Sequence, residues 1–409
     1  MLSYEVVAFM ICLAALFSYA NHRFIRLSPT IGIMVLSLAF SVLLFATGKL
    51  MPSWAKPVIG VITGIDFHDL LMNVMLGFLL FAGSLHIDAR SLRKELPAVI
   101  ALSTIGILIS TGLIGTALFY VFGMFHLPVP YIYCLLFAAL ISPTDPIAVL
   151  AILRQAGLPK SLELKIAGES LFNDGVAVVV FITILEVAQT GIDQLSGVDI
   201  SLLFLREAGG GILFGLAIGY LSYRAMRSVD KYEVEVLITV ATVCGGYIVA
   251  GLLHVSGPLA MVVAGILIGT KARTQVSEET RDYLNKFWEL IDELLNALLF
   301  MLLGLEMLIV KQDVTILAIS GITILIVLAA RWLSVVIPIT FLRRRMIFER
   351  HAVAILTWGG LRGGLSVALA LSLPPQSYRD EFVAITYAVV VFSIIVQGLT
   401  IGTVYKRLK

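Results

Sequence analysis

The chain has 409 residues, of which 59% are hydrophobic and only 14% are charged, and its mean hydropathy is +1.00. Soluble domains carry roughly 25% charged residues, so this composition excludes an ordinary soluble protein and predicts an integral membrane protein. The formal net charge of +2 gives no reason to expect nucleic acid as a partner.

The apolar sequence divides into about thirteen predicted membrane spans, because a helix needs roughly 20 mostly apolar residues to cross a bilayer. We interpret the first, from Val6 to Tyr19, as a retained span, since no small-residue cleavage motif follows it. We therefore expect an all-α polytopic protein that forms one membrane unit over residues 1–409. The predicted span centres are Leu13, Leu38, Gly77, Gly112, Leu140, Val178, Gly215, Ala241, Val263, Met301, Ile326, Val367 and Val390.

The positive charges give the orientation, because Lys and Arg accumulate in cytoplasmic loops. The connections between predicted spans alternate between the two sides of the membrane. Those on one side hold 22 of the 29 Lys and Arg residues, Lys165 among them. Arg331 and Arg362 fall inside spans. The connections on the other side hold Lys49, Lys56, Arg206, Lys311 and Arg379. We expect a multi-pass protein of the cell membrane with its N-terminus outside and its C-terminus in the cytoplasm.

Three cysteines, Cys12, Cys134 and Cys244, each lie within an apolar stretch and lack the spacing of metal ligands. We expect all three to be buried thiols.

Two predicted spans contain helix-breaking sequences. The fifth holds Ser142-Pro143-Thr144-Asp145-Pro146, whose prolines remove backbone donors, so the helix should unwind around Thr144 and Asp145. The twelfth holds Gly359-Gly360-Leu361-Arg362-Gly363-Gly364, and each glycine costs about 0.5–1 kcal/mol of helix stability relative to alanine. Paired interruptions in oppositely oriented halves indicate a secondary transporter built from inverted repeats, with its site near the midplane. The alternative is a pair of ordinary kinks.

The sixth span carries a polar stripe. Ser170 and Asp174 are four residues apart and share a helix face, as do Glu169 and Asn173. Together with Thr144 of the opened fifth span, this stripe offers hard oxygen ligands that suit a small alkali cation such as Na+.

A carboxylate inside a membrane is costly, so Asp174 is expected to face a cavity and to exchange protons near neutral pH. Competition between a proton and a cation for Asp174 would make the protein an antiporter. A purely structural Asp174 is the alternative. For Asp145, ion binding competes with a structural role as partner of helix-end amides or of Asn173.

Three further charges in the spans, Glu169, Arg331 and Arg362, are expected to form a structural ion pair, because an unpaired guanidinium in the membrane is expensive. The sequence does not say which arginine pairs with Glu169. Glu289, Asp292 and Glu293 precede the tenth span and could form a cytoplasmic cation funnel, or merely a solvated helix face.

Other titratable residues lie near predicted span ends. Glu186 and Glu306 are expected to reach an interface or a solvated cavity, and His86, His126 and His254 are expected to be solvated.

At these motifs the chain resembles monovalent cation:proton antiporter family 1, the NhaP-type Na+/H+ antiporters related to animal sodium/proton exchangers. The resemblance covers essentially the whole length and is carried by residues 142–146, 168–175 and 358–364. It implies two crossed, unwound helices and a homodimer with a core domain at about 97–190 and 313–405. It further implies a dimerisation or gate domain at about 1–90 and 200–275, and a connecting helix at about 280–310.

The resemblance also implies a site. Asp174, Ser170 and Thr144 would bind Na+ or Li+, Asn173 would contact Asp145, and Glu169 would pair with a core arginine. An Asn-Asp pair, where electrogenic relatives have two aspartates, implies electroneutral exchange of one cation for one proton. We expect no cofactor besides the transported Na+ and H+. Some relatives carry an acidic residue in the third span where this chain has Phe81-Ala82-Gly83.

Several alternatives remain open at the level of sequence. One is a K+/H+ or mixed monovalent cation/proton antiporter, because selectivity depends on cavity geometry. A cation channel and an intramembrane aspartyl protease are more remote. The protease would need Asp145 and Asp174 to share a proton, and proteolysis would not explain the glycine-rich break or Arg362. We therefore expect a transporter rather than an enzyme.

Overall fold

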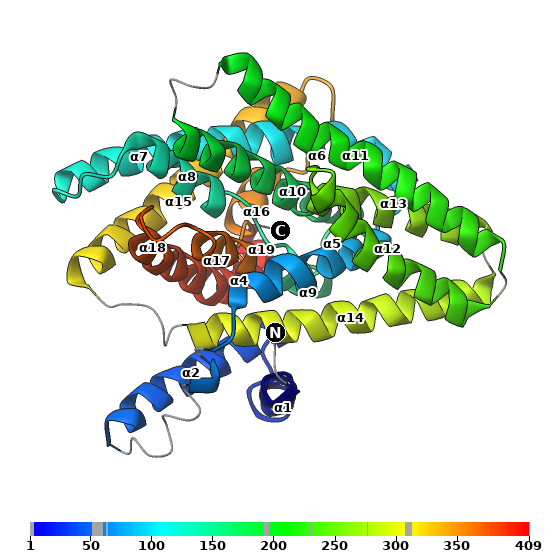
Figure 1. The fold of residues 1–409 in the computed structure, drawn as a ribbon, viewed down its shortest axis with the longest axis horizontal. Helices are drawn as coiled ribbons and strands as arrows, with labels where there is room; N and C mark the ends of the chain where they lie inside the picture. Colours follow the sequence, from blue (N-terminus) through cyan, green and yellow to red (C-terminus); the bar gives the residue numbers. More distant parts are fainter. Residues whose placement is uncertain are drawn as a thin grey trace.

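The computed structural model describes residues 4–50, 60–62, 64–191, 196–229, 231–275, 277–306 and 313–408 (Figure 1). Lys56 and Lys311 of the charge pattern lie outside this set, as does the side chain of Lys49. Helices and their connections make up the described residues, which contain no strand, so the predicted all-α fold class is confirmed.

The helices follow the chain in one continuous series. The first half comprises α1 (Tyr4–Ala20), α2 (Pro29–Leu50), α4 (Phe67–Asp69), α5 (Leu76–Leu85), α6 (Ala89–Ile100), α7 (Gly106–Met124), α8 (Tyr131–Ile141), α9 (Ile147–Gln155) and α10 (Lys160–Thr190). The second half comprises α11 (Gly197–Arg227), α12 (Tyr232–Leu252), α13 (Gly257–Gln275), α14 (Glu278–Leu305), α15 (Val314–Leu342), α16 (Ala352–Trp358), α17 (Gly364–Leu371), α18 (Arg379–Phe392) and α19 (Gly398–Leu408). Short π-helical segments extend α1 and join α4 to α5, α6 to α7 and α18 to α19.

Nine helical stretches in the described part of the chain are long and apolar enough to cross a membrane. The predicted centres at Leu140, Val263, Met301 and Val367 fall elsewhere, in α8, α13, α14 and α17. The structure therefore accommodates every predicted centre in a helix, while the count of thirteen spans stays a prediction.

Short polar side chains fix several helix starts. Ser196 and Asp199 form a reciprocal capping box at the start of α11, and Asp88 accepts hydrogen bonds from two backbone amides at the start of α6. Such caps satisfy backbone N–H groups that have no partner within the helix.

Small residues let the long helices approach closely. A Cβ atom added at Gly215 of α11 would lie 2.5 Å from the carbonyl oxygen of Ala260 of α13. Ser41 of α2 donates a 2.9 Å hydrogen bond to the carbonyl of Gly304 of α14. Because lipid and side chains are equally apolar, such close packing and interhelical hydrogen bonds are what hold membrane helices together.

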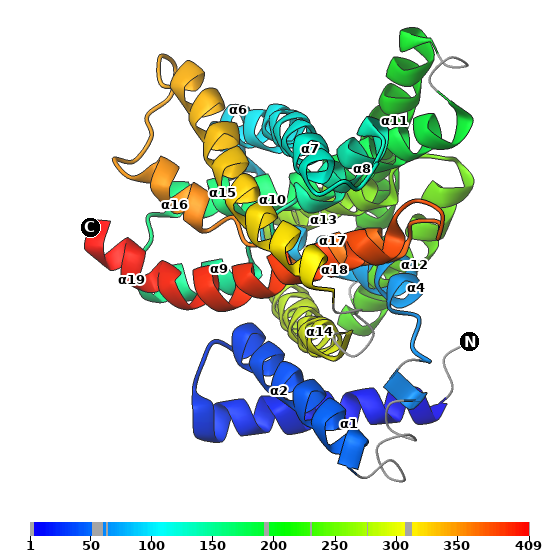
Figure 2. The same cartoon turned by 90° about the vertical axis from the view of Figure 1, so that its left-hand side faces the viewer.

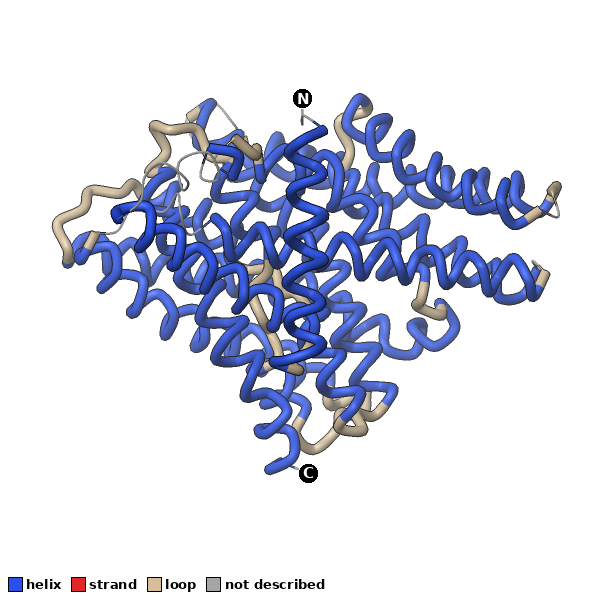
Figure 3. The backbone as a smooth tube through the Cα atoms, turned by 90° about the horizontal axis from the view of Figure 1, so that it is seen from below, coloured by secondary structure: helices blue, strands red, loops and turns tan. Residues whose placement is uncertain are grey.

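Both predicted interruptions are present and they meet. Residues 142–146 separate α8 from α9, and residues 359–363 separate α16 from α17. The N–H of Asp145 donates a 2.8 Å hydrogen bond to the carbonyl of Leu361, which joins the two breaks in an antiparallel bridge. Figure 3 shows non-helical chain crossing in the middle of the molecule.

The expectation for the cysteines is wrong at two positions. Cys134 is buried in α8, but Cys12 of α1 and Cys244 of α12 are exposed. In a membrane protein the outer face of a helix is as apolar as its inner face, so hydropathy alone does not distinguish lipid contact from burial.

Candidate functional site

The two interruptions place four helix ends around one point. The C-terminal ends of α8 and α16 leave backbone carbonyls unpaired there, and the N-terminal ends of α9 and α17 leave unpaired amides. Carbonyl ends attract cations and amide ends attract anions, since the helix dipoles end here. The charged side chains of the site follow this rule.

Arg362 binds the end of α8. Its Nη1 atom donates hydrogen bonds to the carbonyls of Ser142 and, at 2.9 Å, Pro143. The residue is only 2% exposed. The guanidinium thus caps two carbonyls at the end of α8, and that of Ser142 would otherwise pair with the N–H that Pro146 lacks.

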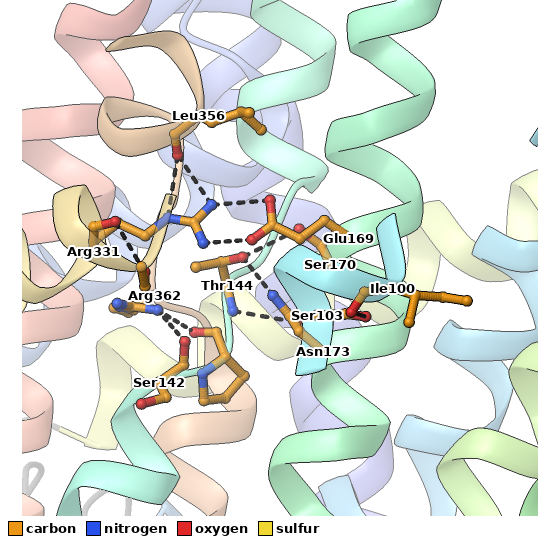
Figure 4. Close-up of polar contacts among 12 residues, drawn as sticks. Ile100, Ser103, Ser142, Thr144, Glu169, Ser170, Asn173, Arg331, Leu356 and Arg362 are labelled. Atoms are coloured by element: carbon orange, nitrogen blue, oxygen red, sulfur yellow. Dashed lines mark hydrogen bonds and ion pairs between the residues drawn. The ribbon is translucent and has the colours of Figure 1, made fainter. Parts of the chain in front are cut away.

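Arg331 of α15 binds the end of α16 and also pairs with an acid. Its Nε and Nη2 atoms donate to the carbonyl of Leu356 at 3.2 and 3.0 Å. Both Nη atoms bind Glu169 of α10, with 3.0 Å between Nη2 and Oε2 (Figure 4). Glu169 is 1% exposed, so this is a bidentate ion pair in the protein interior.

Asp145 faces the amide ends. Its carboxylate accepts a 2.9 Å hydrogen bond from the N–H of Ile147, the first residue of α9. A Cβ atom added at Gly363, just before α17, would lie 2.6 Å from Asp145 Oδ2. Glycine at 363 is therefore needed for the carboxylate to lie between the two helices.

Thr144 connects the break to the polar stripe on α10. Its hydroxyl lies 3.3 Å from the Ser170 hydroxyl and accepts a 2.8 Å hydrogen bond from the Asn173 amide (Figure 4). The Thr144 N–H donates to Asn173 Oδ1 at 3.5 Å. All three side chains are buried.

Asp174 follows Asn173 on α10 and is half-buried. Within the described ranges, no hydrogen bond or ion pair reaches its carboxylate, although it interacts electrostatically with Asp145. It is thus the acid of the site whose oxygens remain available, on the same helix as Ser170 and Asn173.

The comparisons with known proteins agree on one family. A family model described as "Sodium/hydrogen exchanger, transmembrane" matches residues 11–407. The Na(+)/H(+) antiporter NhaP of Pseudomonas aeruginosa is 48% identical, and the alignment covers 99% of this chain and 96% of that protein. The Na(+)/H(+) antiporter NhaH of Halobacillus dabanensis is 35% identical over 92% of this chain and 97% of its own length.

This chain belongs to the sodium/hydrogen exchanger family. The solved structure of the sodium proton antiporter MjNhaP1 from Methanocaldococcus jannaschii matches the fold with a TM-score of 0.75 at 19% identity. That match covers 99% of this chain and 98% of the other.

The sodium/hydrogen exchanger geometry distributes the predicted residues in ways that the sequence left open. Glu169 pairs with Arg331, whereas Arg362 binds carbonyls. Asn173 forms its hydrogen bonds with Thr144. Asp145 uses a helix-end amide, which was one of its two expected structural roles.

The predicted funnel residues lie on α14 of this exchanger. Glu289 and Glu293 are exposed, and Asp292 is half-buried and interacts electrostatically with Asp145. Asp292 is therefore the least exposed of the three predicted funnel acids.

Among the residues near span ends, Glu186 and the three histidines are exposed as expected. Glu306 is only 7% exposed, so the expected solvated cavity is wrong for it, while a position at the membrane interface stays a prediction. The positive charge of Arg379 acts on Glu306, which makes burial of this acid less costly.

Lys165 does not lie in a connection between spans, where the charge pattern placed it. This residue lies inside α10 and is fully buried, and its Nζ atom is 3.3 Å from both Glu95 of α6 and Glu349. It also lies 5.0 Å from the ring centroid of Phe348. Glu349 additionally accepts a hydrogen bond from Ser161. This cluster attaches the connection between α15 and α16 to α10, so it supports the broken helix.

The Lys165 cluster should make stability depend on pH. Burial alone would raise the pKa of Glu349, but hydrogen bonds from Ser161 and Lys165 and the Lys165 charge bring the pKa below the ordinary 4.5. Because the folded protein holds the ionised form, this stabilisation is present above pH 4.5 and is lost as the pH falls through the lowered pKa. Glu349→Gln should therefore cost about 1–3 kcal/mol at pH 7 and progressively less in acid, as measured by chemical unfolding in detergent.

Glu163→Gln is the matched control, because Glu163 pairs with the exposed Arg154 at the same end of α10. It should change stability by less than about 0.5 kcal/mol. If both variants lost the same unfolding free energy at every pH, the assigned role of Glu349 would be contradicted.

Proposed function

We propose that this protein is a secondary transporter that exchanges Na+ for H+ across the membrane, with Asp174 as the group that both ions use. The observation that carries the proposal is the available, half-buried carboxylate of Asp174, which follows Asn173 and lies one helical turn from Ser170 on α10, the helix whose side chains bond Thr144. Hard oxygen ligands suit Na+ or the smaller Li+. The curated relatives of similar length are named Na(+)/H(+) antiporters, which supports the same assignment.

Competition explains coupling in this proposal. A proton and a cation each neutralise Asp174, and neutralisation lowers the cost of carrying the site through the low-dielectric interior. The unoccupied, charged form is costly to move, so the site changes sides only with one ion bound. Asn173 is neutral beside Asp174, so one cation replaces one proton and the exchange is electroneutral.

The proposed movement takes place between the two domains that the sequence analysis predicts. The core, at about 97–190 and 313–405, would carry the crossed helices and move against a dimerisation or gate domain at about 1–90 and 200–275. The helix at about 280–310 would connect them, and two copies would form a homodimer in the cell membrane. The excess of Lys and Arg on alternate connections supports a cytoplasmic C-terminus.

Asp174→Asn tests the assignment. Purified protein in liposomes with an imposed pH gradient should release protons when Na+ is added, and the variant should lose this response, because an amide cannot exchange a proton. Expected activity is at most about one hundredth of wild type, since both ligands lose their shared group. Asp282→Asn, which changes an exposed acid of α14, should retain wild-type exchange.

Na+, Li+ and K+ are compared in the same assay to define selectivity. Sodium-dependent proton release that persists in Asp174→Asn would disprove the role of Asp174. Ion flux without proton coupling in the wild type would disprove antiport itself.

A further inference from the structure

The turn between α1 and α2 contains an open pocket of about 600 Å³. Figure 2 shows these two helices side by side along the lower edge of the molecule, joined by this turn. The pocket is lined by Ser18, Asn21, His22, Arg23, Arg26, Leu27 and Pro29. Among the residues that the structure describes, no acidic side chain belongs to this lining.

The conformation of the turn is specifically maintained. Asn21 is buried, and its side chain both donates to the carbonyl of Leu27 at 3.0 Å and accepts from its N–H at 3.2 Å. Arg26 adopts the left-handed conformation, with φ of 60°, and its N–H donates to the carbonyl of Asn21 at 2.7 Å. A left-handed arginine is unfavourable by itself, so the surrounding hydrogen bonds hold it in place.

The arginine side chains that line the pocket are those of Arg23 and Arg26. Arg23 and Arg26 are both exposed, and no ion pair joins either of them to an acid in the part of the chain that the structure describes. Two guanidinium groups and the His22 ring therefore present several hydrogen-bond donors to one open space. Guanidinium groups favour phosphate because their donors match its oxygens in pairs.

The pocket also lies at the ends of two membrane spans. The first candidate span is Tyr4–Ile25 and the second begins at Pro29, so the turn lies where lipid headgroups meet water. Large apolar side chains border it on the outer surface: Tyr19 is 63% exposed and Phe24 is 74% exposed. Such a surface next to a phosphate-binding group suits a molecule with acyl chains better than a free ion.

We propose that this pocket binds the phosphate of an anionic phospholipid, with the acyl chains against the exposed apolar face of α1. Phosphate is the shared chemistry of a lipid headgroup and a free phosphate ion, and the flanking aromatic side chains favour the lipid. This inference goes beyond ion exchange and does not depend on it.

The test measures thermal unfolding of the full-length protein in an uncharged detergent. Phosphatidylglycerol, phosphatidylcholine and inorganic phosphate are titrated separately. Phosphatidylglycerol should raise the unfolding temperature of the wild type, and the other two additions should have little effect. Arg23→Gln/Arg26→Gln should need about thirtyfold more phosphatidylglycerol for half of this effect, because each arginine contributes roughly a fivefold gain in affinity for an anionic lipid.

Two further variants make the test specific. Arg343→Gln/Arg344→Gln removes the same charge from exposed residues at the end of α15 and should respond like the wild type. Arg26→Gly removes one charge while favouring the left-handed backbone, so it should fold and show an intermediate response.

Each other outcome overturns the proposal. If both double variants needed equally more phosphatidylglycerol than the wild type, the result would show only a general attraction of anions to arginine. Equal stabilisation by phosphatidylcholine would exclude recognition of the anionic headgroup. Full stabilisation by inorganic phosphate would make this a site for the free ion rather than for a lipid.

Discussion

Replacing Arg331 by methionine should destabilise the folded protein by about 3–5 kcal/mol, because it leaves Glu169 charged and buried without a partner. The substitution also removes both hydrogen bonds to the carbonyl of Leu356. That carbonyl lies in the last turn of α16 and has lost its helical partner at the break. The free energy of unfolding in detergent micelles is the measurement that checks this.

The double variant Glu169→Met/Arg331→Met should be less destabilised than Arg331→Met alone. Removing both partners eliminates the uncompensated charge, and two methionines restore apolar packing. The two single substitutions should therefore be strongly non-additive, with a coupling free energy of about 0.5–3 kcal/mol. Additive losses would mean that the ion pair contributes little.

Arg362→Met gives a useful comparison within the same core. Arg362 binds the carbonyls of Ser142 and Pro143, and in the described part of the chain no carboxylate is among its hydrogen-bond partners. Its removal leaves neutral groups without partners, at about 1–3 kcal/mol for each such group. We therefore expect Arg362→Met to rescue no acid substitution, whereas Arg331→Met should partly rescue Glu169→Met.

The features that the sequence predicted well are those that act locally on the backbone. The prolines at 143 and 146 and the glycines at 359–364 break helices wherever the rest of the chain lies. The stripe from Glu169 to Asp174 depends only on helical spacing. Both are recognisable without any knowledge of tertiary contacts.

The features that could not be predicted depend on which distant segments meet. Glu169 and Arg331 are 162 positions apart, and Arg362 has the same charge at a similar separation. Only the path of α15 past the end of α16 determines which arginine is the partner. The burial of Lys165 likewise requires Glu95 and Glu349 to approach from two other segments.

Gly363→Ala should abolish or strongly impair ion exchange while leaving the protein folded. The new Cβ atom would lie 2.6 Å from Asp145 Oδ2 and 2.7 Å from Asp145 Cβ. Rotation of the Asp145 side chain can relieve the first contact but not the second, so the backbone of the break must shift. The rate of exchange should fall at least about a hundredfold, because a displacement of about 1 Å in a precisely arranged site can cost that much activity.

Gly112→Ala is the matched control, since a Cβ atom at this position of α7 meets nothing within 4 Å. It should retain exchange and should slightly stabilise the helix. If Gly363→Ala acts by displacing Asp145, the variant should keep most of its thermal stability and lose its sodium-dependent proton release in liposomes.

The way in which Gly363→Ala loses ion exchange distinguishes two roles for the break between α8 and α9. Displacing Asp145 also affects Thr144, its neighbour, whose hydroxyl bonds both Ser170 and Asn173. If the break only connects α8 to α9, a small shift should alter the rate and leave the sodium concentration for half-maximal exchange unchanged. If Thr144 helps to bind the cation, that concentration must rise together with the loss of rate, and we expect this second result.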